Sequence, residues 1–295
     1  MNRLLITGAN SYIGTSVETY LQKFKDKYIV ETIDMIDGSW REKDFSNYDC
    51  VFHVAGLAHA DVGKVTKEVK SFYYKINTEL AIETAKKAKS DGVKQFIFMS
   101  SMIVYGESAP IGKNKIIKID TKPEPANFYG DSKLRAEQGI LPLSEADFKV
   151  VVVRPPMIFG KDSKGNYPIL SKIAKKIPVF PLIKNQRSML HIDNLCEFIY
   201  LMIANGEKGL FFPQNKEYIQ TSRLVKRIAA IHHKKVISTR IFNPFVFLLS
   251  KFPGEIGGMV NKAFGNLVYD KKMSDYKNFI YCVNDFKESI NKTEK

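Results

Sequence analysis

Two residue types that can exchange protons stand four positions apart, at Tyr129 and Lys133. On a helix this spacing places both side chains on one face, one turn apart. A free tyrosine keeps its proton up to about pH 10, so acid/base work near neutrality needs a fixed cation that favours the phenolate. Lys133 is the candidate cation. The same spacing also occurs in ordinary amphipathic helices, so the pair needs support from other segments.

A strand that ends in hydroxyl side chains gives the first support. Residues 95–99 form a largely apolar run, and Ser100 and Ser101 follow it directly. Functional groups of open parallel sheets gather at the carboxyl ends of the strands, so Ser101 is the expected catalytic hydroxyl. The alternative interpretation is a pair of serines that only closes a strand.

The amino terminus gives the second support, because residues 3–14 are typical of a strand, a tight turn and a helix start. Gly8 permits a sharp turn, and Gly14 permits close packing of helix against strand. The amides exposed at the start of a helix can hold a pyrophosphate. This segment therefore predicts a dinucleotide site.

Asp34 lies at the expected end of the second strand, about where a dinucleotide site carries its acidic residue. A carboxylate there accepts hydrogen bonds from the adenosine ribose and repels a 2′-phosphate. This favours NAD. NADP stays possible because Arg41 and Lys43 are nearby cations and because Asp37 is a competing carboxylate.

Taken together, the motifs resemble the extended short-chain dehydrogenase/reductases, in particular the NAD-dependent nucleotide-sugar epimerase/dehydratase family. The Thr-Gly-x-x-Gly-x-x-Gly turn (with Ser11 at its second glycine), the Ser-x-x-Val-Tyr-Gly strand end and the Tyr-x-x-x-Lys helix follow one another in order. The resemblance covers about residues 1–215. Residues 94–101, 153–160 and 185–188 are also similar to enzymes of bacterial capsule and surface-polysaccharide clusters, which include 4-ketoreductases.

The resemblance implies a role for individual residues. The catalytic residues would be Ser101, Tyr129 and Lys133. The cofactor contacts would come from the strand ends and the catalytic helix: Gly8, Asn10, Ser11, Tyr12, Ile13, Gly14, Asp34, Asp44, Phe45, Ala55, Gly56, Tyr129, Lys133 and Pro156. The substrate contacts would be Asn77, Ser101, Tyr105 and Arg187, with the Arg187 guanidinium pairing with phosphate oxygens. The alternative for Arg187 is a surface ion pair.

Three departures from the family pattern bear on the reaction. Ser11 replaces the middle glycine of the turn, although its hydroxyl can donate a hydrogen bond to a phosphate. Met102 and Ile103 follow Ser101 where 4,6-dehydratases carry an acidic pair, which disfavours dehydration. Met157 stands where galactose epimerases carry a substrate-contacting asparagine. Orthodox UDP-galactose epimerase activity is therefore disfavoured.

The alternation of strands and helices predicts an α/β fold with a doubly wound, Rossmann-like parallel sheet and a smaller C-terminal substrate lobe. The expected dinucleotide-binding core is residues 1–155, with 186–212 returning to it. The expected substrate lobe is residues 156–185 and 213–295. A chain of 295 residues that is 44% hydrophobic and 26% charged can bury a large core.

The formal charge of +14 does not predict a nucleic-acid partner, because the lysines are dispersed along helices with apolar inward faces. No apolar run approaches the length of a membrane span, and no signal peptide is visible, so we expect a cytoplasmic protein without stable membrane insertion. The three cysteines are widely spaced, which indicates reduced thiols. The five histidines, His53, His59, His191, His232 and His233, form no metal-binding pattern.

The apolar segment from Ile241 to Phe252 is interrupted by Pro244 and is too short to span a bilayer. We expect it in the core of the substrate lobe. The alternative is an interfacial membrane contact through this segment and its flanking lysines.

The sequence thus predicts an NAD(P)-dependent nucleotide-sugar 4-epimerase or 4-ketoreductase that acts at the sugar C4 in surface-polysaccharide precursor synthesis, with a UDP-sugar as the expected substrate. The resemblance also implies a homodimer built from helices near Thr78 and Tyr129. The alternative is a non-catalytic dinucleotide-binding sensor or scaffold, because this fold can keep its cofactor site after losing its chemistry.

Overall fold

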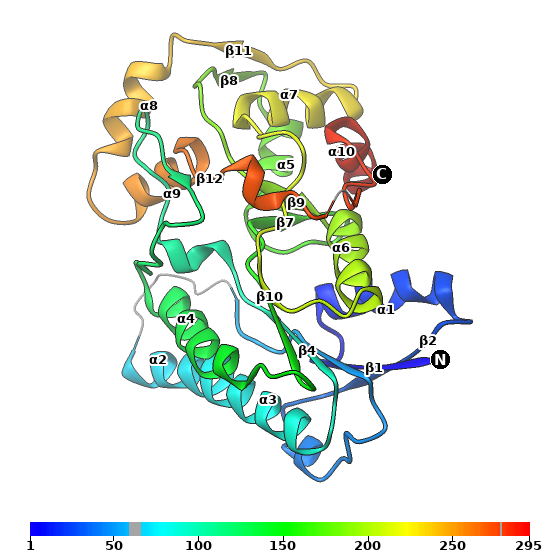
Figure 1. The fold of residues 1–295 in the computed structure, drawn as a ribbon. Helices are drawn as coiled ribbons and strands as arrows, with labels where there is room; N and C mark the ends of the chain where they lie inside the picture. The colour runs from blue at the N-terminus through cyan, green and yellow to red at the C-terminus, as the bar shows by residue number, and fades with distance from the viewer. Residues whose placement is uncertain (59–65, 278) are drawn as a thin grey trace. The chain divides into compact units, whose positions relative to one another are not determined.

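A computed structural model describes residues 1–58, 66–277 and 279–295 of the chain. The chain divides into two compact units (Figure 1). The first consists of Met1–Gly106, Lys122–Pro155 and Ile192–Pro213, and the second of Glu107–Thr121, Pro156–His191 and Gln214–Lys295. The assignment of cofactor binding to one unit and substrate binding to the other stays a prediction.

A six-stranded sheet forms the centre of the first unit, in the order β10-β6-β4-β3-β1-β2, with every neighbouring pair parallel. The strands are β1 (Asn2–Thr7), β2 (Tyr28–Ile33), β3 (Cys50–His53), β4 (Gln95–Met99), β6 (Lys149–Val153) and β10 (Gly209–Phe211). The chain passes from β1 to β2 at one edge and then returns to β3 on the other side of β1. Ligands of such sheets bind at the carboxyl ends of the strands beside this reversal. The predicted α/β class with a parallel, Rossmann-like sheet is confirmed.

Helices cover both faces of this sheet (Figure 1). α1 and α6 pack together on one face, and α2, α3 and α4 gather on the other. Their bounds are α1 (Tyr12–Leu21), α2 (Lys67–Tyr74), α3 (Leu80–Ser90), α4 (Phe128–Ile140) and α6 (Ile192–Ala204). Because both faces are covered, β3, β4 and β6 are buried along nearly their whole length, which explains their continuous apolar sequences.

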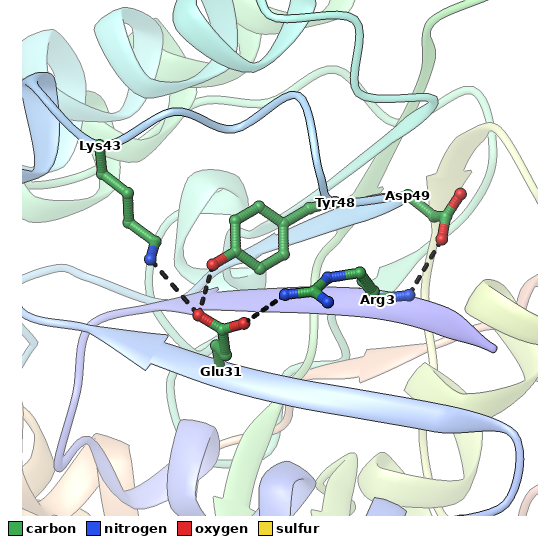
Figure 2. Close-up of polar contacts among 5 residues, drawn as sticks. All are labelled: Arg3, Glu31, Lys43, Tyr48 and Asp49. Atoms are coloured by element: carbon green, nitrogen blue, oxygen red, sulfur yellow. Dashed lines mark hydrogen bonds and ion pairs between the residues drawn. The ribbon is translucent and has the colours of Figure 1, made fainter.

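A polar cluster around Glu31 of β2 ties three strands together (Figure 2). The Glu31 carboxylate accepts hydrogen bonds from the Tyr48 hydroxyl at 2.6 Å and from Arg3 of β1 at 2.8 Å, and Lys43 lies at 3.4 Å. The backbone amide of Arg3 donates to Asp49, which directly precedes β3, at 2.9 Å. The hydrogen bond from Tyr48, together with the hydrogen bond from Lys43 and the charges of Lys43 and Arg3, lowers the pKa of Glu31.

The second unit contains three two-stranded parallel pairs, β7 with β9, β8 with β11, and β5 with β12. The strands are β5 (Ile116–Ile117), β7 (Met157–Phe159), β8 (Val179–Pro181), β9 (Met189–His191), β11 (Ile237–Thr239) and β12 (Val268–Tyr269). The helices are α5 (Asn166–Lys176), α7 (Thr221–Ile231), α8 (Asn243–Ser250), α9 (Glu255–Phe264) and α10 (Phe286–Glu294). A buried core that includes Phe159, Leu224 and Ile290 joins α5, α7 and α10.

The expectation that residues 241–252 form core is wrong. Val246 is buried, but most of the apolar side chains around it are exposed. We call the following exposed residues the α8–α9 surface: Ile237, Ile241, Phe242, Phe245, Phe247, Leu248, Phe252, Ile256 and Met259. Across the described residues, no helix combines the length and the apolar character needed to cross a membrane.

Candidate active site

The carboxyl end of β4 presents Ser101. The Ser100 amide donates to the Val153 carbonyl at 2.8 Å, which keeps the chain paired with β6 as the strand ends. Ser101 itself is extended, and its hydroxyl accepts a hydrogen bond from the Ile103 amide at 3.2 Å, capping a short 3₁₀ turn, Met102–Tyr105. The serine hydroxyl is therefore fixed at the edge of the sheet where ligands bind.

Helix α4 carries Tyr129 in its first turn because Asn127 caps the helix. The Asn127 side chain accepts from the Gly130 amide at 2.9 Å. A side chain at Gly130 would place its Cβ only 2.9 Å from the carbonyl oxygen of Ile103. Glycine thus lets α4 approach the 3₁₀ turn after Ser101, which brings the tyrosine and the serine together.

Lys133 is buried one turn further along α4. Its ammonium donates to the Met99 carbonyl at 2.9 Å and lies 4.8 Å from the centre of the Phe98 ring. Burial lowers the pKa of Lys133 to about 8, and the charge of Glu137 opposes this shift. The ammonium therefore has a fixed position and a proton that it holds less tightly than a free lysine does.

Tyr129 is only partly exposed, and its ring meets that of Tyr73 edge-on at 6.3 Å. Burial raises the pKa of Tyr129 to about 12, although a hydrogen bond with Ser101 lowers it. Desolvation is the larger effect on this pKa. The expectation that Lys133 favours the phenolate stays a prediction. The prediction that Ser101 and Tyr129 share one site agrees with their interaction.

A buried ion pair lies behind these residues. Arg154, directly after β6, makes a bidentate contact with Glu137 of α4, with its Nε 2.9 and 3.1 Å from the two carboxylate oxygens. Ser100 donates to the same carboxylate, and a further Arg154 nitrogen donates to the Tyr105 hydroxyl at 2.6 Å. The pair thus joins α4 to the ends of β4 and β6. The predictions from the sequence do not include this pair, although an arginine that directly follows an otherwise apolar strand is a usable signal for it.

The turn after β1 has the shape that a pyrophosphate needs. Gly8 has φ +105°, and a Cβ there would lie 2.8 Å from the amide nitrogen of Ala55. Asn10 adopts φ 62°, and Ser11 caps α1 by accepting from the Gly14 amide at 3.1 Å. The Ile13 amide has no partner within the described part of the chain. A helix start with a free amide and a serine hydroxyl that can still donate fits a dinucleotide pyrophosphate.

The residues expected to contact the cofactor beyond the β1 turn differ in their exposure and in their hydrogen-bond partners. Asp34 follows β2 directly, is exposed and accepts from the Ile36 amide at 2.9 Å. The Asp44 carboxylate is bound by Ser46, and the Phe45 side chain is fully buried in the core. Tyr12 lies in the first turn of α1, beside the expected pyrophosphate site.

The two cations that could favour NADP are both engaged. Arg41 makes a bidentate ion pair with Glu83 at 2.5 and 2.6 Å. Lys43 faces Glu31 in the cluster of Figure 2. Both cations are therefore already paired with carboxylates, and neither offers an unpaired charge that would bind a 2′-phosphate beside Asp34.

Gly56 and Asn77 shape the region beside Lys133. A Cβ at Gly56 would lie 3.1 Å from the Lys133 nitrogen and 3.0 Å from the Asn77 side-chain oxygen. Asn77 occupies a π-helical segment, Lys75–Glu79, and binds both backbone polar groups of Leu57 and the hydroxyl of Ser132. The carboxamide thus joins the loop after β3 to α4. Its expected contact with substrate stays a prediction.

Pro156 and Arg187 belong to the second unit, so their placement at the cofactor or the substrate stays a prediction. Arg187 donates to the Ser108 hydroxyl at 3.0 Å, and burial lowers the pKa of its guanidinium to about 10. No carboxylate among the described residues forms an ion pair with it. The described residues thus offer no partner for the alternative of a surface ion pair, and the guanidinium is suited to an external anion.

The histidines form no metal site within the described residues. His53 is fully buried at the end of β3 and shares a hydrogen bond of 2.8 Å with the Thr7 hydroxyl. Burial, reinforced by the nearby charge of Lys133, lowers the pKa of His53 to about 3, so the imidazole is neutral. His59 lies outside the described residues.

The doubly wound sheet, the phosphate-shaped turn and the Ser-Tyr-Lys set define a class of dinucleotide-dependent enzymes that act on hydroxyl and carbonyl carbons. The model of the NAD dependent epimerase/dehydratase family matches residues 4–219. The chain belongs to this family, and the predicted enzyme class is confirmed.

Two relatives share much of the sequence. A UDP-glucose 4-epimerase of Vibrio cholerae is 29% identical over 248 residues, which cover 77% of this chain and 74% of the relative. An N-acetyl-alpha-D-glucosaminyl-diphospho-ditrans,octacis-undecaprenol 4-epimerase of Escherichia coli O157:H7 is 27% identical over 281 residues, which cover 86% of this chain and 82% of the relative.

Solved structures share the fold. A dTDP-4-dehydrorhamnose reductase from Clostridium acetobutylicum has a TM-score of 0.71 at 18% identity, covering 99% of this chain and 98% of that one. A UDP-glucuronic acid 4-epimerase from Bacillus cereus, in complex with NAD, has a TM-score of 0.70 at 17% identity, covering 99% and 96%.

Removing one partner of the Glu137–Arg154 pair leaves a buried charge without compensation. We expect Glu137→Ala to lower the free energy of unfolding by about 3–5 kcal/mol, measured by urea denaturation. The double variant Glu137→Met/Arg154→Met, which removes both charges, should recover a large part of that loss. Equal losses in the single and double variants would contradict the account.

Proposed function

We propose that the protein is an NAD-dependent 4-epimerase of a nucleotide sugar, with a UDP-sugar as substrate, in the synthesis of surface-polysaccharide precursors. The observation that carries this proposal is the convergence of Ser101, Tyr129 and Lys133 at the carboxyl edge of a parallel sheet. The 4-epimerase relatives support the reaction type. The exposed carboxylate of Asp34 supports NAD.

Tyr129, Ser101 and Lys133 have different roles in the proposed proton transfer. A nicotinamide bound there would accept and return hydride at the sugar C4. Tyr129 takes the proton of the C4 hydroxyl and gives it back, and Ser101 hydrogen-bonds the same oxygen. Lys133 holds the ribose of the dinucleotide and stabilises the phenolate by its charge. The burial of Lys133 and the desolvation of Tyr129 strengthen these interactions.

The Ser11 hydroxyl and the Ile13 amide would hold the pyrophosphate of the dinucleotide, and Asp34 its adenosine ribose. Arg187 supports an anionic substrate, because its guanidinium is desolvated without a carboxylate partner in the described residues. A nucleotide sugar carries such an anion in its own pyrophosphate.

A 4-ketoreductase that consumes reduced cofactor is the alternative reaction, favoured by Met157 at the position where galactose epimerases carry asparagine. A sugar carried on a polyprenyl diphosphate is the alternative substrate. The exposed apolar α8–α9 surface and the undecaprenol-linked substrate named for the Escherichia coli relative favour it. A non-catalytic sensor is disfavoured because the complete Ser-Tyr-Lys set is retained. The homodimer and the cytoplasmic location also stay proposals.

The first test is Tyr129→Phe, which removes the proton-transferring oxygen and keeps the ring. We expect kcat to fall by about 10²–10⁴-fold, while NAD affinity measured by calorimetry stays within about twofold. Wild-type protein should interconvert UDP-N-acetylglucosamine and UDP-N-acetylgalactosamine, or their polyprenyl-diphosphate counterparts, without net change in absorbance at 340 nm.

Other outcomes of the same assay separate the alternatives. Net loss of 340 nm absorbance with a 4-keto-6-deoxy-UDP-sugar and NADH or NADPH identifies a reductase. A Tyr129→Phe variant as active as wild type on every substrate would refute the assigned proton transfer.

The second test concerns the cofactor. Asp34→Ser removes a carboxylate that binds ribose and repels a 2′-phosphate, so we expect the NAD-over-NADP affinity ratio to fall by about tenfold or more. The matched control is Asp37→Ser, because the Asp37 carboxylate is also exposed and is bound by Ser39. A larger effect at Asp37 than at Asp34 would show that the wrong carboxylate was assigned.

A further inference from the structure

The α8–α9 surface concentrates exposed apolar side chains. Of the 20 exposed large apolar side chains in the described part of the chain, nine lie between residues 237 and 259. Ile241 is 81% exposed, Met259 64% and Phe245 61%. Exposed apolar patches of this kind mark contacts with membranes or other molecules.

Helical spacing explains how so many side chains face outward. In α8, Val246 points inward, whereas Phe245, Phe247 and Leu248 occupy the rest of the helix surface and are exposed. In α9, Ile256 and Met259 are three positions apart and share an exposed face.

Specific contacts hold α8 and α9 together and attach them to the second unit. The Asn261 side chain of α9 donates to the Ser250 carbonyl of α8 at 3.0 Å. A Cβ at Gly257 would collide with the carbonyl oxygen of Phe252, so glycine permits the close turn between the helices. Val246 and Phe264 belong to the core of the second unit and anchor the helices to it.

Positive charges accompany the apolar side chains. Lys234, Lys235, Arg240 and Lys251 are all exposed, and none of them pairs with a carboxylate among the residues that the structure describes. The Lys251 ammonium lies 5.1 Å from the centre of the Phe247 ring. Residues 237–262 contain a single acidic residue, Glu255.

Apolar and aromatic side chains beside unpaired cations are typical of an element that rests in the interface of an anionic bilayer. A second copy of this chain fits less well. The usual two-fold interface would bring the same cations of both copies together, with few carboxylates to oppose them.

We propose that the α8–α9 surface binds the surface of a bilayer that contains anionic phospholipids. The apolar side chains enter the headgroup region, and Arg240, Lys251 and the two lysines before β11 contact lipid phosphates. The contact is peripheral. It goes beyond the proposed reaction, because it assigns the protein a membrane surface as a partner whether its substrate is free or lipid-linked.

The test is sedimentation of the full-length protein with vesicles of phosphatidylcholine, with and without phosphatidylglycerol. We expect binding to the mixed vesicles that weakens with added salt. Phe245→Ser/Phe247→Ser should weaken it by at least about tenfold, since two aromatic anchors are lost. Arg240→Gln and Lys251→Gln should each weaken it by about fivefold. The matched control is Ile169→Ser/Lys172→Gln on α5, which changes exposed residues of the same kinds and should leave binding unchanged.

Each other outcome overturns the proposal. Absence of phosphatidylglycerol-dependent sedimentation, or equal losses in the α8 and α5 variants, would remove the lipid assignment. Dimerisation in the absence of vesicles that the Phe245→Ser/Phe247→Ser variant abolishes would assign the surface to a second copy instead. Circular dichroism checks that the variants fold, and assays on a water-soluble UDP-sugar keep this test separate from the test of the proposed reaction.

Discussion

Desolvation of the Lys133 ammonium is the constraint on which the site depends. The ammonium is buried, is held by one backbone carbonyl and lies beside an aromatic ring. Taking a charge out of water disfavours the charged form, which lowers the pKa of Lys133 to about 8. Folding therefore disfavours the protonated lysine at neutral pH, and this destabilisation is relieved as the pH rises above about 8. The same burial fixes the ammonium one helical turn after Tyr129.

The same desolvation acts in the opposite direction on Tyr129 and raises its pKa to about 12. The phenol is thus a poor base in the protein by itself. Glu137 connects the pKa of Lys133 to the packing of the surrounding strands and helix. Its charge raises the pKa of Lys133, while its ion pair with Arg154 holds the ends of β4 and β6 against α4. The geometry and the charge of the site therefore depend on the same buried pair.

The local parts of this arrangement could be predicted from the sequence. Turn glycines, the hydroxyl residues that follow an apolar strand, and helical spacing predict the β1 turn and the positions of Ser101, Tyr129 and Lys133, because these features depend on near neighbours. The direction of the Tyr129 shift depends on how densely distant segments surround the ring, and spacing carries no such information. Glu137 stands four residues after Lys133, so it could have been recognised, but its partner Arg154 comes from another element. Residues 241–252 were misassigned to the core because an apolar composition does not say which way a helix faces.

Burial lowers the pKa of Lys133 and raises the pKa of Tyr129, and nuclear magnetic resonance tests this central claim most directly. The protein would carry ¹³C at the lysine ε-carbons and the tyrosine ζ-carbons, with Lys133→Met and Tyr129→Phe used to assign the signals. The account predicts that Lys133 titrates near pH 8 and that Tyr129 stays protonated through about pH 10, where a free tyrosine is half ionised. A lysine that titrates near its ordinary value of about 10.4, with a tyrosine that ionises near about 10, would contradict it.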